Sequence, residues 1–271
     1  MFATERELPI TGGAGKRAYV RGMFTAIAPR YDLLNHLLSL NIDRRWRRIA
    51  VDRLGWERTP QGTYLDLCAG TMDLAAELGN RRGFLGRVIA TDFVQEMLLL
   101  GRAKSARAVP CNADAMSLPF ADASFDGATV GFGVRNLMDL EAGLREAARV
   151  LRPGARLVVL EFTVPPHQPL RGLYFAYFRH LLPLIGRFVS KHRDAYDWLP
   201  ASVLAFPGPK ELGERMGEAG FESVGYDLLF GGVCSVHVGE KASTVNGQRS
   251  TGGATAQLPG SLAPRLPGSL T

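Results

Sequence analysis

This sequence contains few cysteines and no long apolar run. The three cysteines among its 271 residues, Cys68, Cys111 and Cys234, are widely separated and show no CxxC spacing. Such usage excludes a disulfide framework and a zinc site built on paired cysteines, and it favours a reducing compartment. No stretch of about 18 uncharged apolar residues occurs, which argues against a membrane-spanning helix. The first residues also lack the basic-then-apolar order of a signal peptide. We therefore expect a soluble, cytoplasmic protein.

Two common nucleotide-binding motifs are absent as well. The apolar strand at 64–68 runs into a turn, residues 69–73, that lacks the later glycines of the dinucleotide-binding motif G-x-G-x-x-G. No G-x-x-x-x-G-K-[ST] sequence is present, which excludes a P-loop. What remains is the D-x-x-x-G pattern of class I methyltransferases, from Asp66 to Gly70. A buried aspartate that merely caps the turn is the alternative explanation for Asp66.

What the sequence does contain is an acidic residue at the end of the next strand. Asp92 closes that strand twenty-one positions after Thr71. A strand–turn–helix brings backbone close to a nucleoside, and a carboxylate at the second strand accepts hydrogen bonds from two ribose hydroxyls. After the third strand, Asp114 is placed to accept from an adenine amino group. The expected donor-binding residues are Asp66, Gly70, Thr71, Asp92, Phe93, Asn112, Ala113, Asp114 and Gly131.

The alternation of strands and helices predicts an α/β fold. The expected strands are 64–68, 87–91, 108–111, 125–130 and 156–161, and the expected helices between them are about 72–79, 94–104 and 139–150. Right-handed crossovers then give a mostly parallel sheet with helices on both faces. Residues 152–155 are predicted to be a turn. After a helix at 210–219, strands at 221–230 and 232–238 should complete seven strands, the C-terminal one antiparallel.

Composition predicts one domain with two appendages. Residues 1–17 are polar and glycine-rich, and we expect them to be flexible. Residues 242–271 lose all periodicity and contain a near-repeat of Leu-Pro-Gly-Ser-Leu, as disordered tails do. The domain proper is expected over 18–241. Within it, 18–55 should form a helical lid and 162–207 an insert on the substrate side.

The formal net charge of +6 is concentrated near the N-terminus. Between Lys16 and Arg53 there are nine lysines and arginines but only three aspartates. This stretch is either a solvated helix face or a surface that attracts phospholipid headgroups. Nucleic acid is not expected, because no RNA-binding motif or zinc finger accompanies the arginines. Basic and aromatic residues also alternate over Leu170–Val189, which suits a membrane interface, the wall of an apolar pocket, or a cap on the core.

Three further segments resemble the ubiquinone/menaquinone biosynthesis C-methyltransferase family. They are Tyr31–Ser39 continuing to Arg45-Trp46-Arg47, the F-G-x-R-N segment Phe132–Asn136, and Arg149–Phe162. The stretch 194–207 is similar too, so the resemblance covers about residues 17–240. Three positions depart from the family pattern, namely Met72 for a glycine, Asp43 for a histidine and Gly131 for a serine. We expect Met72 to crowd the methionine end of a methyl donor.

The resemblance implies a Rossmann-like class I S-adenosylmethionine-dependent methyltransferase that needs no metal. Its implied substrate is a reduced polyprenyl quinone, either demethylmenaquinol or the benzoquinol precursor of ubiquinone. Rival functions are methylation of another small lipid or phenolic metabolite, and donor binding without catalysis. The implied partners are the quinol and, peripherally, the inner face of the cell membrane. The oligomeric state is left open between monomer and homodimer.

The resemblance also suggests roles for residues outside the donor site. Arg135 is expected to orient a water or to stabilise a developing phenolate, because arginine stays charged and is a poor base. Asn136 is expected to position the ring. The alternative for both is a structural turn held by the arginine. Tyr31, Asp32 and Asn35 are expected to form a lid over the donor, or else to cap a helix.

Overall fold

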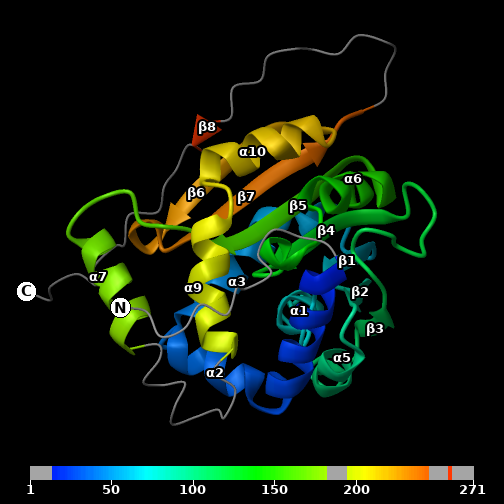
Figure 1. Ribbon diagram of the computed structural model, residues 1–271. Coiled ribbons are helices and arrows are strands. Elements are labelled where there is room, and N and C mark those ends of the chain that lie inside the picture. The colour runs from blue at the N-terminus through cyan, green and yellow to red at the C-terminus, as the bar shows by residue number, and fades with distance from the viewer. Residues whose placement is uncertain (1–13, 182–193, 244–255, 258–271) are drawn as a thin grey trace, which may run out of the picture.

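The computed structural model describes residues 14–181, 194–243 and 256–257, and its centre is one twisted sheet (Figure 1). The strand order is β3-β2-β1-β4-β5-β7-β6-β8. The strands are β1 Thr63–Leu67, β2 Arg87–Asp92, β3 Ala108–Asn112, β4 Phe125–Gly131, β5 Leu151–Phe162, β6 Phe221–Leu229, β7 Cys234–Lys241 and β8 Ala256–Gln257. Of these, only β7 runs antiparallel to its neighbours. The predicted seven strands are therefore confirmed, and a two-residue eighth strand joins the edge.

Helices cover both faces of the sheet. They are α1 Ala14–Ile27, α2 Tyr31–Leu38, α3 Ile42–Leu54, α4 Asp73–Gly79, α5 Gln95–Gly101, α6 Leu140–Val150, α7 Leu170–Ala176, α9 Asp194–Ala205 and α10 Pro209–Glu218. Successive residues of β5 point to opposite faces. Val158 and Leu160 pack in the core under α3 and α4, whereas Leu157 and Val159 pack in the core under α6 and α10. All four are fully buried, which is why this strand is a continuous apolar run.

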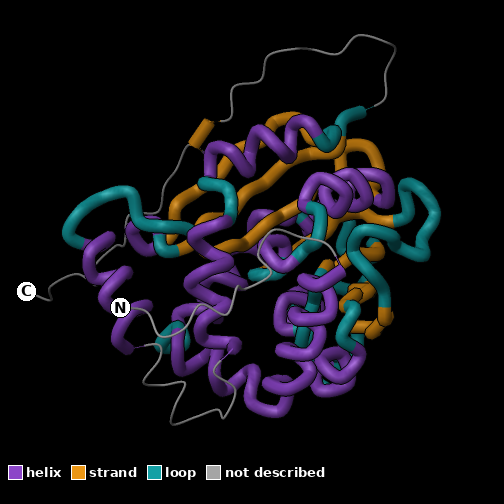
Figure 2. The backbone as a smooth tube through the Cα atoms, viewed as in Figure 1, coloured by secondary structure: helices purple, strands orange, loops and turns teal. Residues whose placement is uncertain are grey.

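A group of helices lies at one end of the sheet. Helices α1, α2, α7 and α9, labelled in Figure 1, gather there (Figure 2). Val20 and Met23 of α1 pack on Trp198 of α9, and Leu34 of α2 packs on Tyr174 of α7. The predicted lid over 18–55 and the predicted insert over 162–207 thus meet each other in the described residues. Among all the residues that the structure describes, no helix is both long and apolar enough to cross a membrane.

Three boundaries differ from those expected. Helix α1 begins at Ala14, so residues 14–17 belong to the lid rather than to the N-terminal segment. Lys16 is buried, and its Nζ donates to the carbonyls of Arg135 and Leu137. The turn expected at 152–155 lies inside β5 as a bulge, where the pairing with β4 jumps from Leu151 to Arg156. Finally, residues 256–257 of the expected disordered tail pair with β6, while most of that tail lies outside the described residues.

Candidate functional site

The site begins where β1 and β2 end. Gly70, in the turn after β1, has a φ of +53°, a backbone conformation that glycine adopts without strain. Its N–H donates to one oxygen of Asp92 at 2.8 Å, and the N–H of Val94 donates to the other at 2.8 Å. Burial raises the pKa of Asp92, and the backbone donors oppose that shift. The structure therefore brings the predicted ribose-binding carboxylate directly against the predicted turn.

Two small cavities flank this turn. One, of about 50 Å³, is lined by the carboxylates of Asp92 and Asp114 among the apolar side chains of Phe93, Met97 and Met116. The other, of about 30 Å³, has a polar lining that includes Arg47, Asp66, Thr71 and Asp73. Gly70 lines both cavities. A nucleoside matches the first cavity and the charged end of a methyl donor matches the second, so these residues fit such a donor.

The predicted adenine-binding residues lie at different depths. Asp114 lines the larger of the two cavities, but one of its oxygens is 3.0 Å from Arg17 of α1 and the other accepts from the N–H of Met116 at 2.9 Å. Ala113 also lines that cavity. Asn112 is exposed, and its amide donates to the Asp92 carbonyl at 2.8 Å. Asn112 thus supports the strand end, whereas Asp114 lies at the cavity wall and is paired with Arg17.

Asp66 holds three elements together. Its carboxylate accepts from the Thr129 hydroxyl on β4 at 2.8 Å and from the N–H of Ala75 in α4 at 3.0 Å. The same residue lines the 30 Å³ cavity. Burial is the main cause that raises the pKa of Asp66 to about 7, with both hydrogen bonds opposing it. The structure thus contains the turn-capping contact that was the alternative for this aspartate.

The raised pKa of Asp66 predicts a pH dependence of stability. Because the native state binds this proton more tightly than the unfolded chain, the stabilisation is complete below the ordinary value of 3.8 and is lost as the pH rises through about 7. Across that range the free energy of unfolding should fall by about 4 kcal/mol from this group. Asp66→Asn cannot ionise, and its amide can accept from the Ala75 N–H and donate to the Thr129 hydroxyl oxygen, so this variant should remove that fall in urea titrations at several pH values. An unchanged profile would contradict the assignment.

Met72 occupies the position where the family pattern has a glycine. Its φ is +64°, which explains the preference for glycine there. The side chain is fully buried in the core with Leu74, Leu78 and Leu98, and it lines none of the cavities described here. Its Cβ also packs against Gly101, where any Cβ would clash. The expectation that Met72 crowds the donor is therefore wrong, because its side chain points into the core.

We expect Met72→Gly to destabilise the protein without changing donor affinity. The stability lost with the buried side chain exceeds the stability gained when glycine relieves the strained left-handed backbone. The free energy of unfolding should therefore fall by about 1–3 kcal/mol. Urea unfolding and calorimetry with S-adenosylhomocysteine measure the two quantities. Unchanged stability together with tighter binding would restore the crowding hypothesis.

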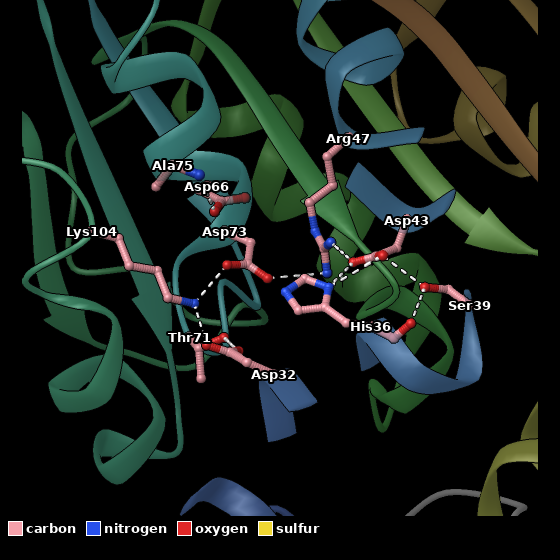
Figure 3. Close-up of polar contacts among 10 residues, drawn as sticks. All are labelled: Asp32, His36, Ser39, Asp43, Arg47, Asp66, Thr71, Asp73, Ala75 and Lys104. Carbon is pink, nitrogen blue, oxygen red and sulfur yellow. Dashed lines mark hydrogen bonds and ion pairs between the residues drawn. The ribbon is translucent and has the colours of Figure 1, made fainter. Parts of the chain in front are cut away.

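A chain of ion pairs links the lid to the turn before α4 (Figure 3). Lys104 Nζ lies 2.6 Å from Asp32 of α2 and 2.6 Å from Asp73 of α4. The Thr71 hydroxyl donates to the other oxygen of Asp32. Asp32, predicted as a lid residue, therefore fastens α2 over the turn.

Arg47 of α3 continues this chain (Figure 3). The guanidinium is buried; one nitrogen lies 3.2 Å from Asp73, and another donates to Asp43. Asp43 also accepts from the Ser39 hydroxyl at 2.7 Å and lies 3.0 Å from Nδ1 of His36. Burial would raise the pKa of Asp43, but Ser39 and Arg47 hold it below its ordinary value. Asp43, which replaces the histidine of the family pattern, is thus paired with Arg47, His36 and the Ser39 hydroxyl.

A larger cavity of about 420 Å³ opens beside the two small ones. Its wall is mostly apolar. Trp46 of α3 contacts Phe132 and Phe162 at the ends of β4 and β5, and residues of α1, α2, α7 and α9 also line the cavity. The rings of Phe132 and Phe162 are 4.5 Å apart. Tyr31 and Phe132 line this cavity and both small ones, so the three meet at these two rings. Asn35 lines the large cavity and hydrogen-bonds to Tyr31.

Arg135 and Asn136 hold the turn after β4. The Arg135 guanidinium donates to Glu161 at 2.6 Å and to the Phe132 carbonyl at 2.6 Å. Asn136 accepts from the indole N–H of Trp198 at 2.9 Å. Burial raises the pKa of Glu161, and Arg135 opposes it. Arg135 lines the large cavity, whereas Asn136 lines the 50 Å³ cavity. Both side chains therefore have structural contacts, and only Arg135 borders the apolar space.

Several residues of the site carried no role in the sequence analysis, namely Lys16, Arg47, Asp73, Lys104 and Trp198. Sequence spacing predicts only one of these contacts, the pair of Asp43 and Arg47, which are four residues apart on a helix. The others meet only through the fold. Among the described residues, no group of three or more His, Cys, Asp or Glu side chains is arranged to hold a metal ion.

Comparison with known proteins gives concordant matches. A model of the ubiE/COQ5 methyltransferase family matches residues 13–241. The chain is 48% identical over 223 residues to a demethylmenaquinone methyltransferase of Thermus thermophilus, covering 81% of this chain and 100% of that protein. It is 44% identical over 245 residues to the one of Deinococcus radiodurans, with coverages of 89% and 100%. It is 43% identical over 232 residues to the ubiquinone/menaquinone biosynthesis C-methyltransferase UbiE of a Geobacter species, with coverages of 82% and 96%.

Solved structures share the fold. One is a chain in the complex between the Haloferax volcanii Trm112 methyltransferase activator and the putative methyltransferase, with a TM-score of 0.59, 19% identity and coverages of 81% of this chain and 98% of that chain. Another is a SAM-dependent methyltransferase from Thermotoga maritima, with a TM-score of 0.55, 20% identity and coverages of 81% and 99%. At these identities the likeness shows the fold alone. It confirms the predicted Rossmann-like methyltransferase fold.

Proposed function

This chain belongs to the ubiE/COQ5 methyltransferase family, and we propose that it transfers a methyl group from S-adenosylmethionine to a ring carbon of a reduced polyprenyl quinone. The observation that carries the proposal is the apolar 420 Å³ cavity that meets the donor cavities at Tyr31 and Phe132. A prenylated aromatic ring matches that wall, and its ring edge would lie at the junction. The names of the relatives point to the same substrate class.

The residues described above can supply what this reaction needs from the protein. The donor carries an electrophilic methyl group on a sulfonium centre. Asp92 would hold the ribose and Asp114 the adenine, while Phe132 and Phe162 pack on the quinol, so that the carbon and the methyl are aligned. Loss of a hydroquinone proton enriches the carbon nucleophile. We propose that Arg135 stabilises the resulting phenolate or orients the water that takes the proton, with Glu161 keeping the guanidinium in place.

The lid is part of the same proposal. Tyr31, Asp32 and Asn35 lie on α2, between the donor turn and the large cavity. Tyr31 borders both donor cavities, and Asp32 is fastened to Thr71 and Lys104. Opening this lid would admit the donor, and closing it would exclude water from the reacting atoms.

Radiolabelled methyl transfer tests the proposal. Purified protein with labelled donor should move label into organic extract when a prenylated naphthoquinol or benzoquinol is present, and much less with the oxidised quinone. Calorimetry with S-adenosylhomocysteine verifies that the donor site is intact. Donor binding without label transfer to either quinol would overturn the assignment, and a panel of other lipids and phenols would then identify the acceptor. No heat of binding would point to a noncatalytic relative, although Met72 no longer supports that alternative.

We also propose peripheral contact with the membrane, because exposed apolar side chains line the large cavity. Leu40 is 77% exposed and Leu173 is 64% exposed, and both line the cavity. Arg44 and Arg45 are exposed nearby on α3. Flotation with anionic vesicles should recover the protein, and Leu40→Asp should reduce that recovery. Equal recovery of both proteins would contradict the proposal. A homodimer remains a prediction.

A further inference from the structure

Three residues in the wall of the 420 Å³ cavity carry a buried polar atom that has no hydrogen-bond partner among the described residues. The atoms are Nε1 of Trp46, Nε of Arg135 and the hydroxyl oxygen of Tyr174 on α7. Trp46, Tyr174 and the Arg135 side chain are each more than nine-tenths buried. All three groups can donate a hydrogen bond, and a buried donor without a partner is costly. This wall is therefore suited to a bound molecule that carries oxygen acceptors.

Two of these donors, those of Arg135 and Tyr174, are electrostatically linked. Arg135 follows β4, and its guanidinium carbon is 5.4 Å from the centroid of the Phe162 ring. Burial raises the pKa of Tyr174, and the positive charge of Arg135 opposes that shift in part. The hydroxyl thus stays protonated at neutral pH and is a neutral donor near a cation. This link places the two donors in the same part of the wall.

We propose that the Tyr174 hydroxyl and the Arg135 Nε–H donate to one ring oxygen of the acceptor, so that Tyr174 selects and positions an oxygenated aromatic ring. This inference rests on the proposed function and deepens it, because it names the group that an otherwise apolar cavity recognises. Two donors on one oxygen favour the phenolate over the neutral hydroxyl, since hydrogen bonds to an ionised acceptor are the stronger ones. Tyr174 thereby adds to the stabilisation proposed for Arg135.

A second tyrosine in the same wall provides the comparison. Tyr177 also lines the cavity, but its hydroxyl donates to the Leu38 carbonyl at 2.9 Å. That donor is already used within the protein, whereas the donor of Tyr174 is not. Tyr174→Phe and Tyr177→Phe each remove a hydroxyl and nothing else, so they form a matched pair of variants.

Urea unfolding without ligands compares the two hydroxyls in the free protein. Tyr174→Phe should unfold at the wild-type urea midpoint or at a higher one, because it removes an unpaired buried group. Tyr177→Phe should unfold at a lower midpoint, because it removes the hydrogen bond to Leu38. If Tyr174→Phe had the lower midpoint of the two, the Tyr174 hydroxyl would have a partner within the protein and the proposal would be overturned.

Binding measurements then test recognition of the ring oxygen. Protein saturated with S-adenosylhomocysteine cannot transfer a methyl group, so two ligands can be titrated without turnover. They are a prenylated naphthoquinol and the matching prenylated naphthalene, which lacks both ring oxygens. Wild-type protein should prefer the naphthoquinol. Tyr174→Phe should bind the naphthoquinol about tenfold more weakly and the naphthalene as wild type does, whereas Tyr177→Phe should keep the wild-type preference.

An unchanged preference for the naphthoquinol in Tyr174→Phe would overturn the proposal. Equal weakening of both ligands would overturn it too, because that result indicates a packing role. The proposed function fails in a different way, namely when wild-type protein with labelled S-adenosylmethionine transfers no label to a quinol. If wild type methylates the quinol while Tyr174→Phe keeps the full preference, the function stands and the role of Tyr174 is wrong.

Discussion

Asp92→Ala is expected to reduce donor affinity by about 100-fold or more. The variant removes a buried carboxylate that would accept from two ribose hydroxyls, and hydrogen bonds to a charged group are each worth about 1.5–3 kcal/mol. The N–H groups of Gly70 and Val94 already hold the carboxylate in one orientation, so donor binding loses little side-chain entropy there. Calorimetry with S-adenosylhomocysteine measures the loss.

The same contacts make a control necessary, because Asp92 also supports the turn. Asp92→Asn retains one oxygen for a backbone N–H but leaves the other N–H without an acceptor, so it should bind the donor about tenfold more weakly than wild type and unfold at a somewhat lower temperature. Micromolar affinity retained in a folded Asp92→Ala protein would show that the ribose lies elsewhere. In that case the 50 Å³ cavity would not be the nucleoside site.

The second large effect concerns stability. Glu161→Leu leaves the buried guanidinium of Arg135 without its counterion, because that ion pair is 2.6 Å long and its side chains are 8% and 1% exposed. We expect the free energy of unfolding to fall by about 3–5 kcal/mol in urea titrations at neutral pH. The double variant Arg135→Met with Glu161→Leu should recover much of that loss, since no charge is then left buried.

An exposed ion pair provides the comparison. Asp122 contacts Arg149, but the Asp122 side chain is 78% exposed. Asp122→Ala should therefore change stability by less than about 1 kcal/mol. If Glu161→Leu were no more costly than Asp122→Ala, the Arg135–Glu161 pair would not be what holds the turn after β4.

The parts of the site that follow from local sequence could be predicted. A strand, a turn with Gly70 and a second strand ending in Asp92 lie together in any parallel arrangement of adjacent strands, because their carboxyl ends meet at one edge. The same reasoning places Asp114, after the third strand, at that edge. The parallel direction of β1 to β5 follows from the alternation of strands and helices, and the antiparallel β7 follows from the short connection to β6.

Contacts between distant segments could not be predicted in this way. Lys104, which follows α5, pairs with both Asp32 of α2 and Asp73 of α4. No local sequence pattern predicts that these three residues lie together. The polar, glycine-rich composition of 1–17 suggested flexibility, yet Lys16 caps carbonyls more than a hundred residues away. At Met72 the sequence shows that a side chain replaces glycine, but it does not show that this side chain points into the core.

Quinone analysis in a bacterial strain lacking its own enzyme of this family tests the central claim most directly. Such a strain accumulates the unmethylated quinone, which mass spectrometry separates from the methylated product. Expression of the wild-type chain should convert the accumulated species to the methylated quinone, and Asp92→Ala should not. Persistence of the unmethylated quinone in cells that contain folded, donor-binding wild-type protein would contradict the account.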